Sequence, residues 1–192
     1  MTMPSEEWLD RTRQALADYL PRRLESQAAT PAAILILVYD RDGEAHVLFT
    51  ERTHQVEHHK GQISFPGGAC DDGDDCLETT ALRETQEEIG VHPEDVEIVG
   101  QLDEMLTISN FRVTPYVGVL RTNSVYPFVI NEHEVARVVE VPLPHLLDER
   151  NMELEVRSHK GKQVLVPAFN YEGHRIWGAT ARMLRQLLEL LV

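Results

Sequence analysis

The sequence has few basic residues relative to acidic ones, and this limits its partners. Its 192 residues contain 18 Lys and Arg against 32 Asp and Glu, which gives a formal net charge of −14. Nucleic-acid binding depends on neutralising phosphates with Lys and Arg, so this balance argues against a nucleic-acid partner and against an anionic membrane surface. A phosphorylated small molecule is still allowed, because divalent cations can invert the local charge.

Cysteines and long apolar runs are also scarce. The only cysteines, Cys70 and Cys76, are too few for a disulfide framework or a zinc site built on two cysteine pairs. The first 20 residues carry scattered charges and no apolar run, so no signal peptide is expected. No stretch has the length and apolar character of a membrane span. These absences predict a cytoplasmic protein.

An ordinary apolar share of 42% predicts a single globular domain with a sizeable core. Residues 5–27 read as an amphipathic helix, with Ser5 as its cap and Pro21 as a break or kink. We expect residues 1–31 to be an N-terminal helix and linker packed on a domain of residues 32–192. Residues 180–191 predict a terminal helix. The apolar side of each of these two helices is explained either by packing on the core or by contact with a second copy in a homodimer.

Between these helices, apolar runs alternate with turn signals. The continuous apolar run 32–39 predicts a strand buried on both faces, and Asp42-Gly43 predicts a hairpin turn. A helix is expected at residues 77–89, and a short helix ends at Leu147. Further strands are predicted at residues 45–51, 62–65, 96–102, 111–120, 135–141, 152–156 and 163–169.

The densest group of charges lies in RETQEEIGV, residues 83–91. Glu84, Glu87 and Glu88 stand at i, i+3 and i+4, so on a helix their carboxylates share one face. Three such carboxylates repel one another unless a cation lies among them, and oxygen-rich clusters suit Mg²⁺ or Mn²⁺. Taken alone, the run is also explained by a solvated acidic face of a helix.

The residues around this run favour a binding site over a solvated face. Phe65-Pro66-Gly67-Gly68 forms a sharp turn with permissive backbone before the helix. An acidic loop, residues 71–75, follows that turn, and Gly90 ends the helix. Together, turn, acidic loop, charged helix and terminating glycine are far more specific than any one of them.

This stretch resembles the signature of the Nudix hydrolases, which reads Gly, five residues, Glu, seven residues, Arg-Glu, an apolar residue, any residue, Glu-Glu, any residue, Gly and an apolar residue. Residues 83–91 match its second half, with Thr85 at the usual apolar place. Counting back from Arg83 puts the first acidic position on Asp75. Counting on from Gly68, with one extra residue, puts it on Asp74. Both residues stay open at this point.

The residues before the signature resemble the extra motif of the coenzyme A pyrophosphatase branch. They are LFTERT at residues 48–53, His59, and GQISFPGG at residues 61–68. One position departs from the branch, because Glu57 stands where the family usually carries Arg. The resemblance covers roughly residues 32–192.

The resemblance implies an α/β fold, the Nudix-type α/β/α sandwich with a mixed β-sheet. It implies an enzyme, a Nudix pyrophosphatase that hydrolyses the diphosphate bond of coenzyme A or acyl-coenzyme A to 3′,5′-ADP and (acyl-)4′-phosphopantetheine. Alternative substrates are other nucleoside diphosphate derivatives, such as ADP-ribose, NADH or a dinucleotide polyphosphate, and Glu57 keeps them open. A non-catalytic Nudix-fold nucleotide-binding module is a further alternative, although such modules usually lose glutamates from the signature.

The resemblance and the helix spacing together assign roles to particular residues. Glu84, Glu87 and Glu88 are expected to hold Mg²⁺ or Mn²⁺. Glu87 or Glu134 is the expected general base, with Glu132 as second choice after Glu134. Arg83 is expected to hold a carboxylate. The residues expected to meet the substrate are Arg52, His59, Lys60, Gln62, Gly67 and Gly68.

Overall fold

A computed structural model describes residues 3–25, 28–53, 61–122, 125–159 and 162–192. An eight-stranded sheet forms the centre, with the strand order β3-β2-β1-β7-β5, β4 beside β1, β6 beside β7 and β8 beside β2. Its strands are β1 Thr30–Arg41, β2 Glu44–Arg52, β3 Ile63–Ser64, β4 Gly67–Ala69, β5 Val96–Gln101, β6 Met105–Leu106, β7 Phe111–Leu120 and β8 Val135–Pro142.

Strand β1 lies at the middle of this sheet. It runs parallel to β7 and antiparallel to β2 and β4, so the sheet is mixed as predicted. Leu35 and Ile36 are fully buried and belong to different core clusters, which confirms that the apolar run is covered on both faces. The hairpin to β2 turns at Asp42 and Gly43, both with positive φ, as a tight turn of this kind requires.

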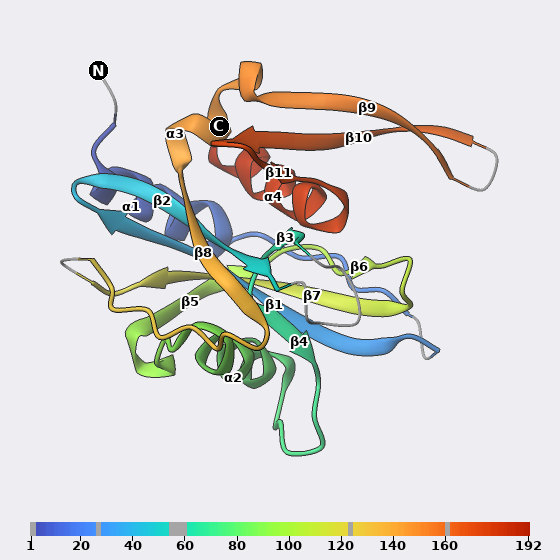
Figure 1. Cartoon of the computed structure of the whole chain (residues 1–192), viewed down its shortest axis with the longest axis horizontal. Coiled ribbons are helices and arrows are strands. Elements are labelled where there is room, and N and C mark those ends of the chain that lie inside the picture. Colours follow the sequence, from blue (N-terminus) through green and yellow to red (C-terminus); the bar gives the residue numbers. More distant parts are fainter. Residues whose placement is uncertain (1–2, 26–27, 54–60, 123–124, 160–161) are drawn as a thin grey trace.

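Helices cover both faces of the sheet (Figure 1). Helix α2, Leu77–Ile89, packs on one face and contributes Ala81 and Ile89 to the core there. Helix α4, Gly178–Leu191, covers the other face together with α1, Ser5–Ala17, and contributes Leu184 and Leu187. The predicted α/β/α sandwich is confirmed.

The predicted helix at residues 5–27 is too long, because α1 ends at Ala17. Beyond it, Arg22 N donates to Asp103 Oδ1 at 2.8 Å, so the chain near Pro21 bonds to the body of the protein instead of continuing a helix. The cap prediction is also wrong. Pro4 holds the cap position, and the Ser5 hydroxyl donates to Asp40. The division of the chain after residue 31 stays a prediction.

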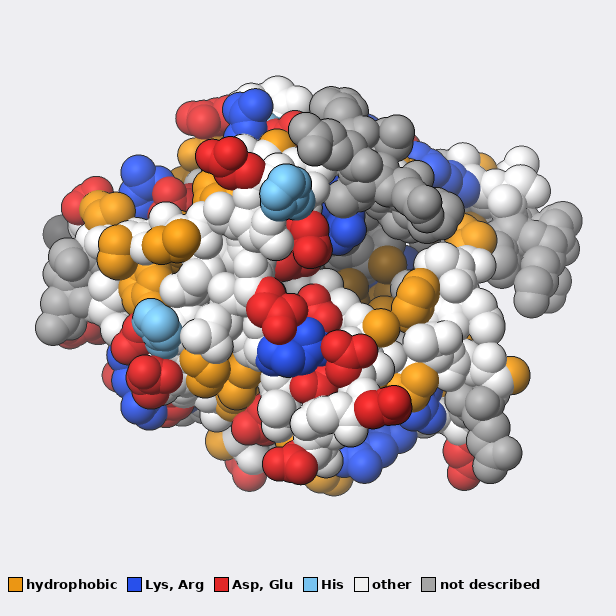
Figure 2. All heavy atoms as spheres, turned by 60° about the horizontal axis from the view of Figure 1, so that its bottom comes forward, with side chains coloured by type: hydrophobic (Ala, Val, Ile, Leu, Met, Phe, Trp, Pro, Cys, Tyr) orange, Lys and Arg blue, Asp and Glu red, His pale blue; other side chains and the backbone are white. Residues whose placement is uncertain are grey.

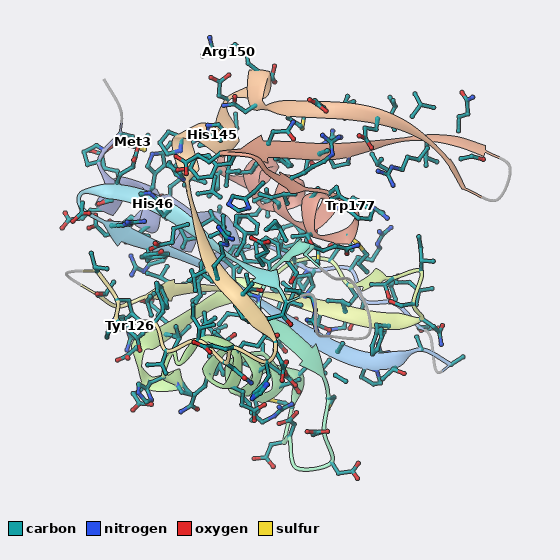
Figure 3. The ribbon with its side chains drawn as sticks, in the orientation of Figure 1. Met3, His46, Tyr126, His145, Arg150 and Trp177 are labelled. Atoms are coloured by element: carbon teal, nitrogen blue, oxygen red, sulfur yellow. The ribbon has the colours of Figure 1, made fainter. Side chains whose placement is uncertain are left out.

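A second sheet of three strands, in the order β11-β10-β9, lies beyond α4 (Figure 1). Its members are β9 Met152–His159, β10 Lys162–Tyr171 and β11 His174–Ile176. Phe169 and Ile176 tie it to the core of α4, and the Arg157 guanidinium lies 5.0 Å from the ring centroid of Trp177, which Figure 3 labels. The remaining helices are α3 Leu143–Leu147, η1 Pro93–Asp95 and η2 Glu149–Asn151. No described helix has the length and apolar character needed to cross a membrane.

Candidate active site

Helix α2 carries the three glutamates and has the bounds that the sequence predicted, Leu77–Ile89. It ends at Gly90, which adopts the left-handed conformation with φ 73°. A side chain at this position would meet Val129, since a Cβ would lie 2.8 Å from Val129 Cβ. Glycine therefore both terminates the helix and admits the segment that later reaches Glu134.

Arg83 lies at the centre of a group of carboxylates. Its Nε donates to Asp74 Oδ1 at 2.9 Å and its Nη2 to Asp74 Oδ2 at 3.0 Å. Its Nη1 lies 2.9 Å from Glu84 Oε1 and 3.1 Å from Glu87 Oε2. The bidentate pair with Asp74 raises the pKa of Arg83 above its ordinary value.

These contacts identify Asp74 as the first acidic residue of the signature. Its side chain is only 2% exposed, and it also accepts hydrogen bonds from Thr80 Oγ1 at 2.8 Å and from Asp71 N at 3.0 Å. The bond to Arg83 holds the pKa of Asp74 well below its ordinary value. Asp75 is exposed. The signature therefore contains one residue more than usual between Gly68 and Arg83.

The three glutamates differ strongly in burial. The side chain of Glu87 is 58% exposed, that of Glu84 is 18% exposed and that of Glu88 is 4% exposed. Burial raises the pKa of Glu84 above its ordinary value. Burial also raises the pKa of Glu88 to about 8; the nearby Arg52 opposes this rise, while Glu134 and Glu84 add to it. Figure 2 shows acidic side chains gathered around a basic one on this face of the molecule, beside a hollow.

Two glycines of β4 let the backbone approach this cluster. A Cβ on Gly68 would lie 2.5 Å from Glu84 Cδ, so only glycine leaves room for that carboxylate. Gly67 has φ 146°, and a Cβ there would lie 2.3 Å from Ala33 O in β1. Because neither residue has a side chain, the backbone at Gly67 can pack against β1 and the backbone at Gly68 can pack against Glu84 of α2.

The end of β2 brings Arg52 to the same place. Arg52 Nη1 lies 3.9 Å from Glu88 Oε1, close enough for a charge interaction. Arg52 N donates to Gln62 O at 3.0 Å, and Gly61 N donates to Arg52 O at 3.0 Å, so Gln62 is held beside Arg52. The other predicted substrate residues, His59 and Lys60, and Glu57 lie outside the described residues.

Glu134 lies on the segment that leads into β8 and that is hydrogen-bonded to the C-terminal end of α2 at Glu88 O and Ile89 O. Its charge acts on the pKa of both Glu84 and Glu88, which places it within electrostatic reach of them. Tyr126 fixes the start of this segment, because its hydroxyl donates to Asp95 Oδ2 at 2.6 Å and accepts from His92 N (Figure 3). Glu132 is exposed on the same segment.

The donor set fits a hard divalent cation. In the described part of the chain no three His, Cys, Asp or Glu side chains stand preassembled around a point, and Glu84 and Glu87 are instead paired with Arg83. Glu88 Oε2, however, is buried and has no hydrogen-bond partner among the residues that the structure describes, and a buried acceptor of this kind needs a proton or a cation. Carboxylate oxygens are the ligands that Mg²⁺ and Mn²⁺ prefer. Glu84 and Glu87 each contact Arg83 Nη1 through one carboxylate oxygen, so the other oxygen of each could bind the cation while Arg83 stays in place.

Comparison with known proteins identifies the family to which the chain belongs. A model of the NUDIX domain matches residues 29–164. The protein named "Uncharacterized Nudix hydrolase NudL" of Salmonella paratyphi B is 40% identical over 157 residues, which cover 81% of this chain and 80% of that protein. The same name, identity and coverage hold for a protein of Salmonella newport.

Solved structures share the fold. DR0079 from Deinococcus radiodurans has a TM-score of 0.54 at 14% identity and covers 82% of each chain. A MutT/nudix family protein from Enterococcus faecalis has a TM-score of 0.52 at 16% identity and covers 99% of this chain and 73% of its own. At such identities the likeness concerns the fold alone. The match of the domain model and of the NudL proteins shows that this chain belongs to the Nudix hydrolase family and is an enzyme of the pyrophosphatase class.

Proposed function

We propose that this Nudix hydrolase cleaves the diphosphate bond of coenzyme A or acyl-coenzyme A with Mg²⁺ or Mn²⁺. The products are 3′,5′-ADP and 4′-phosphopantetheine or its acyl derivative. The substrate class comes from the likeness of residues 48–53 and 61–68 to the motif of the coenzyme A branch. The identity of the substrate is thus an inference from those residues.

The observation that carries the proposal is the contact between that motif and the glutamates of α2. Gly68 lies directly against the Glu84 carboxylate, and Arg52 Nη1 lies 3.9 Å from Glu88 Oε1. A substrate that extends over residues 52 and 62 would therefore have its diphosphate beside Glu84 and Glu88. A motif that recognises coenzyme A has to lie beside the residues that act on the diphosphate, and residues 52, 62 and 68 meet this requirement.

In the proposed reaction a water oxygen attacks one phosphorus, and the bond from that phosphorus to the bridging oxygen breaks. Glu134 or Glu87 accepts the proton of the attacking water as general base, and the second phosphate leaves with the bridging oxygen. Glu84, Glu87 and Glu88 would hold the divalent ion, which supplies positive charge to neutralise phosphate oxygens and polarise phosphorus. Arg83 orients Glu84 and Glu87 through its two contacts.

Substrate contacts are assigned to the polar groups at the open side of this cluster. Arg52 offers a guanidinium next to Glu88 that can bind a phosphate oxygen, and among the described residues its Nε has no hydrogen-bond partner. Gln62 is held beside it. His59 and Lys60 are kept as substrate residues on the strength of the motif, and Gly67 and Gly68 give the diphosphate access to the backbone.

A product assay tests the proposal. The purified protein is incubated with Mg²⁺ or Mn²⁺ and coenzyme A, acetyl-coenzyme A, NADH, ADP-ribose, a diadenosine polyphosphate or dGTP, and the products are separated by chromatography. We expect 3′,5′-ADP from coenzyme A as the best substrate. If coenzyme A stays intact while another diphosphate is cleaved, the substrate assignment is wrong and the hydrolase chemistry stands.

Two variants of the same helix separate catalysis from folding. Glu87→Gln should lower kcat by about 10²-fold or more, the usual scale for losing a group that moves a proton in the transition state. Glu78→Gln, an exposed glutamate in the first turn of α2, is the matched control and should keep wild-type kcat. Equal activity of the two variants would contradict the role given to Glu87.

A further inference from the structure

A β-bulge lies where β2 and β8 meet the candidate site. Glu51 pairs with Arg137, but the next residue, Arg52, pairs with Val135, so Ala136 is an extra residue on β8. Bulges of this kind are frequent next to active sites, where they change the direction of side chains. Here the bulge turns Val135 towards the core under α2 and shifts the preceding Glu134 to the end of β2.

Thr53 directly follows β2 and makes two hydrogen bonds to the shifted segment. Its backbone N–H donates to Glu134 O at 2.9 Å, and its hydroxyl donates to His133 O at 2.9 Å. Thr53 is 7% exposed, so both bonds lie away from bulk water, where they hold their partners most firmly. Thr53 therefore binds two successive carbonyl groups just before β8, one through its backbone N–H and one through its hydroxyl.

The opposite side of the same segment is bound to the end of α2. Asn131 N donates to Glu88 O at 2.9 Å, and Val129 N donates to Ile89 O at 3.0 Å. Glu134 N donates to Asn131 O at 3.0 Å and closes the turn. The turn of residues 131–134 is thus bound on one side to the helix that carries Glu88 and on the other to Thr53, the residue that follows β2.

We propose that Thr53 is a positioning residue that sets the distance between the Glu134 carboxylate and the glutamates of α2. The inference rests on the proposed function and on the choice of Glu134, one of its two candidate general bases, to receive the proton of the attacking water. Thr53 does not need to touch substrate. Its hydroxyl adds a second hydrogen bond to the turn and thereby restricts rotation of the peptide that carries Glu134.

Three variants test the role of the hydroxyl. Thr53→Val keeps the size of the side chain and the backbone N–H but removes the bond to His133 O. Thr53→Ser keeps the hydroxyl and should restore most of the activity. Thr12→Val is the matched control, because Thr12 is also buried and its hydroxyl donates to a backbone carbonyl, Trp8 O, in the distant helix α1.

The first readout is steady-state kinetics on the best diphosphate substrate of the wild type. Thr53→Val should lower kcat by roughly 10-fold or more with little change in KM, since a displacement of about 1 Å in a reacting group costs up to about 10²-fold. Thr12→Val should keep wild-type kcat at temperatures where it stays folded. An unchanged kcat in Thr53→Val, or a Thr53→Ser variant as slow as Thr53→Val, overturns the proposal.

The second readout does not depend on turnover. Hydrogen exchange of the peptide covering residues 125–135 should become faster in Thr53→Val and stay at the wild-type rate in Thr12→Val. Unchanged exchange there means that Thr53 does not hold the turn. If the wild type cleaves no diphosphate, the proposed function fails whatever Thr53 does. Faster exchange in Thr53→Val would then still show that the Thr53 hydroxyl holds the turn of residues 131–134, but Thr53 would not be a positioning residue for this reaction.

Discussion

Replacing Asp74 by Asn tests whether the acidic loop stabilises the site through Arg83. Asp74 accepts two hydrogen bonds from the Arg83 guanidinium and has a side chain that is 2% exposed. Asn has nearly the same shape but no charge, and its amide group would point N–H bonds at a guanidinium that only donates. The substitution therefore removes the ion pair with little change in packing.

The expected loss of unfolding free energy depends on the ion pairs that Arg83 still makes after the substitution. Removing one partner of a buried ion pair usually costs about 3–5 kcal/mol, because the other charge is left without compensation. Arg83 is 25% exposed and retains Glu84 and Glu87, so part of that penalty is relieved. We expect Asp74→Asn to lower the free energy of unfolding by about 2–3 kcal/mol, the scale of hydrogen bonds to charged groups.

Urea unfolding at about pH 7 measures this loss, and Asp75→Asn is the matched control. Asp75 is the neighbouring exposed carboxylate, so its variant should stay within about 0.5 kcal/mol of wild type. Equal unfolding free energies of the two variants would refute the assignment of Asp74.

The dependence on pH gives the same prediction a second check. Arg83 lowers the pKa of Asp74 in the folded state. The ion pair therefore makes its full contribution to the free energy of unfolding at pH values above 3.8, the ordinary pKa of Asp. That contribution is lost as the pH falls through the lower folded value. The gap between wild type and Asp74→Asn should therefore narrow from about pH 4 downwards, and a gap that stays constant on acidification would contradict the ion pair as its source.

Two further pairs of variants follow from the packing. Gly68→Ala should lower kcat while keeping stability near wild type, because the new Cβ, 2.5 Å from Glu84 Cδ, displaces the flexible end of that side chain. Gly73→Ala is its kinetic control, because a Cβ at Gly73 would have no atom of the described residues within 4 Å. Leu184→Ala removes a fully buried side chain from the core under α4 and should lower the free energy of unfolding by about 2–5 kcal/mol, whereas Leu20→Ala, at a site that is 90% exposed, should change it little in the same urea assay. A Leu184→Ala variant as stable as Leu20→Ala would contradict the assigned core.

Most helices and strands were predictable because their signals are local. Residues 77–89 and 111–120 were predicted with the bounds that the structure gives them, since capping residues and apolar spacing act over a few neighbours. The helix at residues 5–27 was predicted too long, because apolar spacing continues past Ala17 while the backbone after it bonds to Asp103. A cytoplasmic location and a homodimer stay predictions.

The site was predictable where one helix carries it. The i, i+3, i+4 spacing places Glu84, Glu87 and Glu88 on α2 without any tertiary information. The choice between Asp74 and Asp75 could not be made by counting, because the count from Gly68 gives Asp74 and the count back from Arg83 gives Asp75. It depends on which carboxylate reaches the guanidinium, and that contact joins residues nine positions apart.

Glu134 shows most clearly why position in the sequence does not fix position at the site. In a regular strand with period two, Val135, Val139 and Val141 would share one face of the sheet. Val139 and Val141 do lie in the core on the side of α4, but Val135 lies in the core on the side of α2. The extra residue Ala136 accounts for this change of face.

That single insertion has a direct consequence for the chemistry. A register slip of one residue reverses the direction of every side chain beyond it, so without the bulge the segment before β8 would leave the sheet on the side away from Glu84 and Glu88. With the bulge, the segment passes over the end of α2, where Glu88 O and Ile89 O accept its N–H groups. Apolar alternation cannot reveal the insertion, since VARVVEV reads as an ordinary strand in either register. The pairing of Arg52 with Val135, and the two bonds from Thr53 that follow it, are therefore what bring a fourth carboxylate to the glutamates of α2.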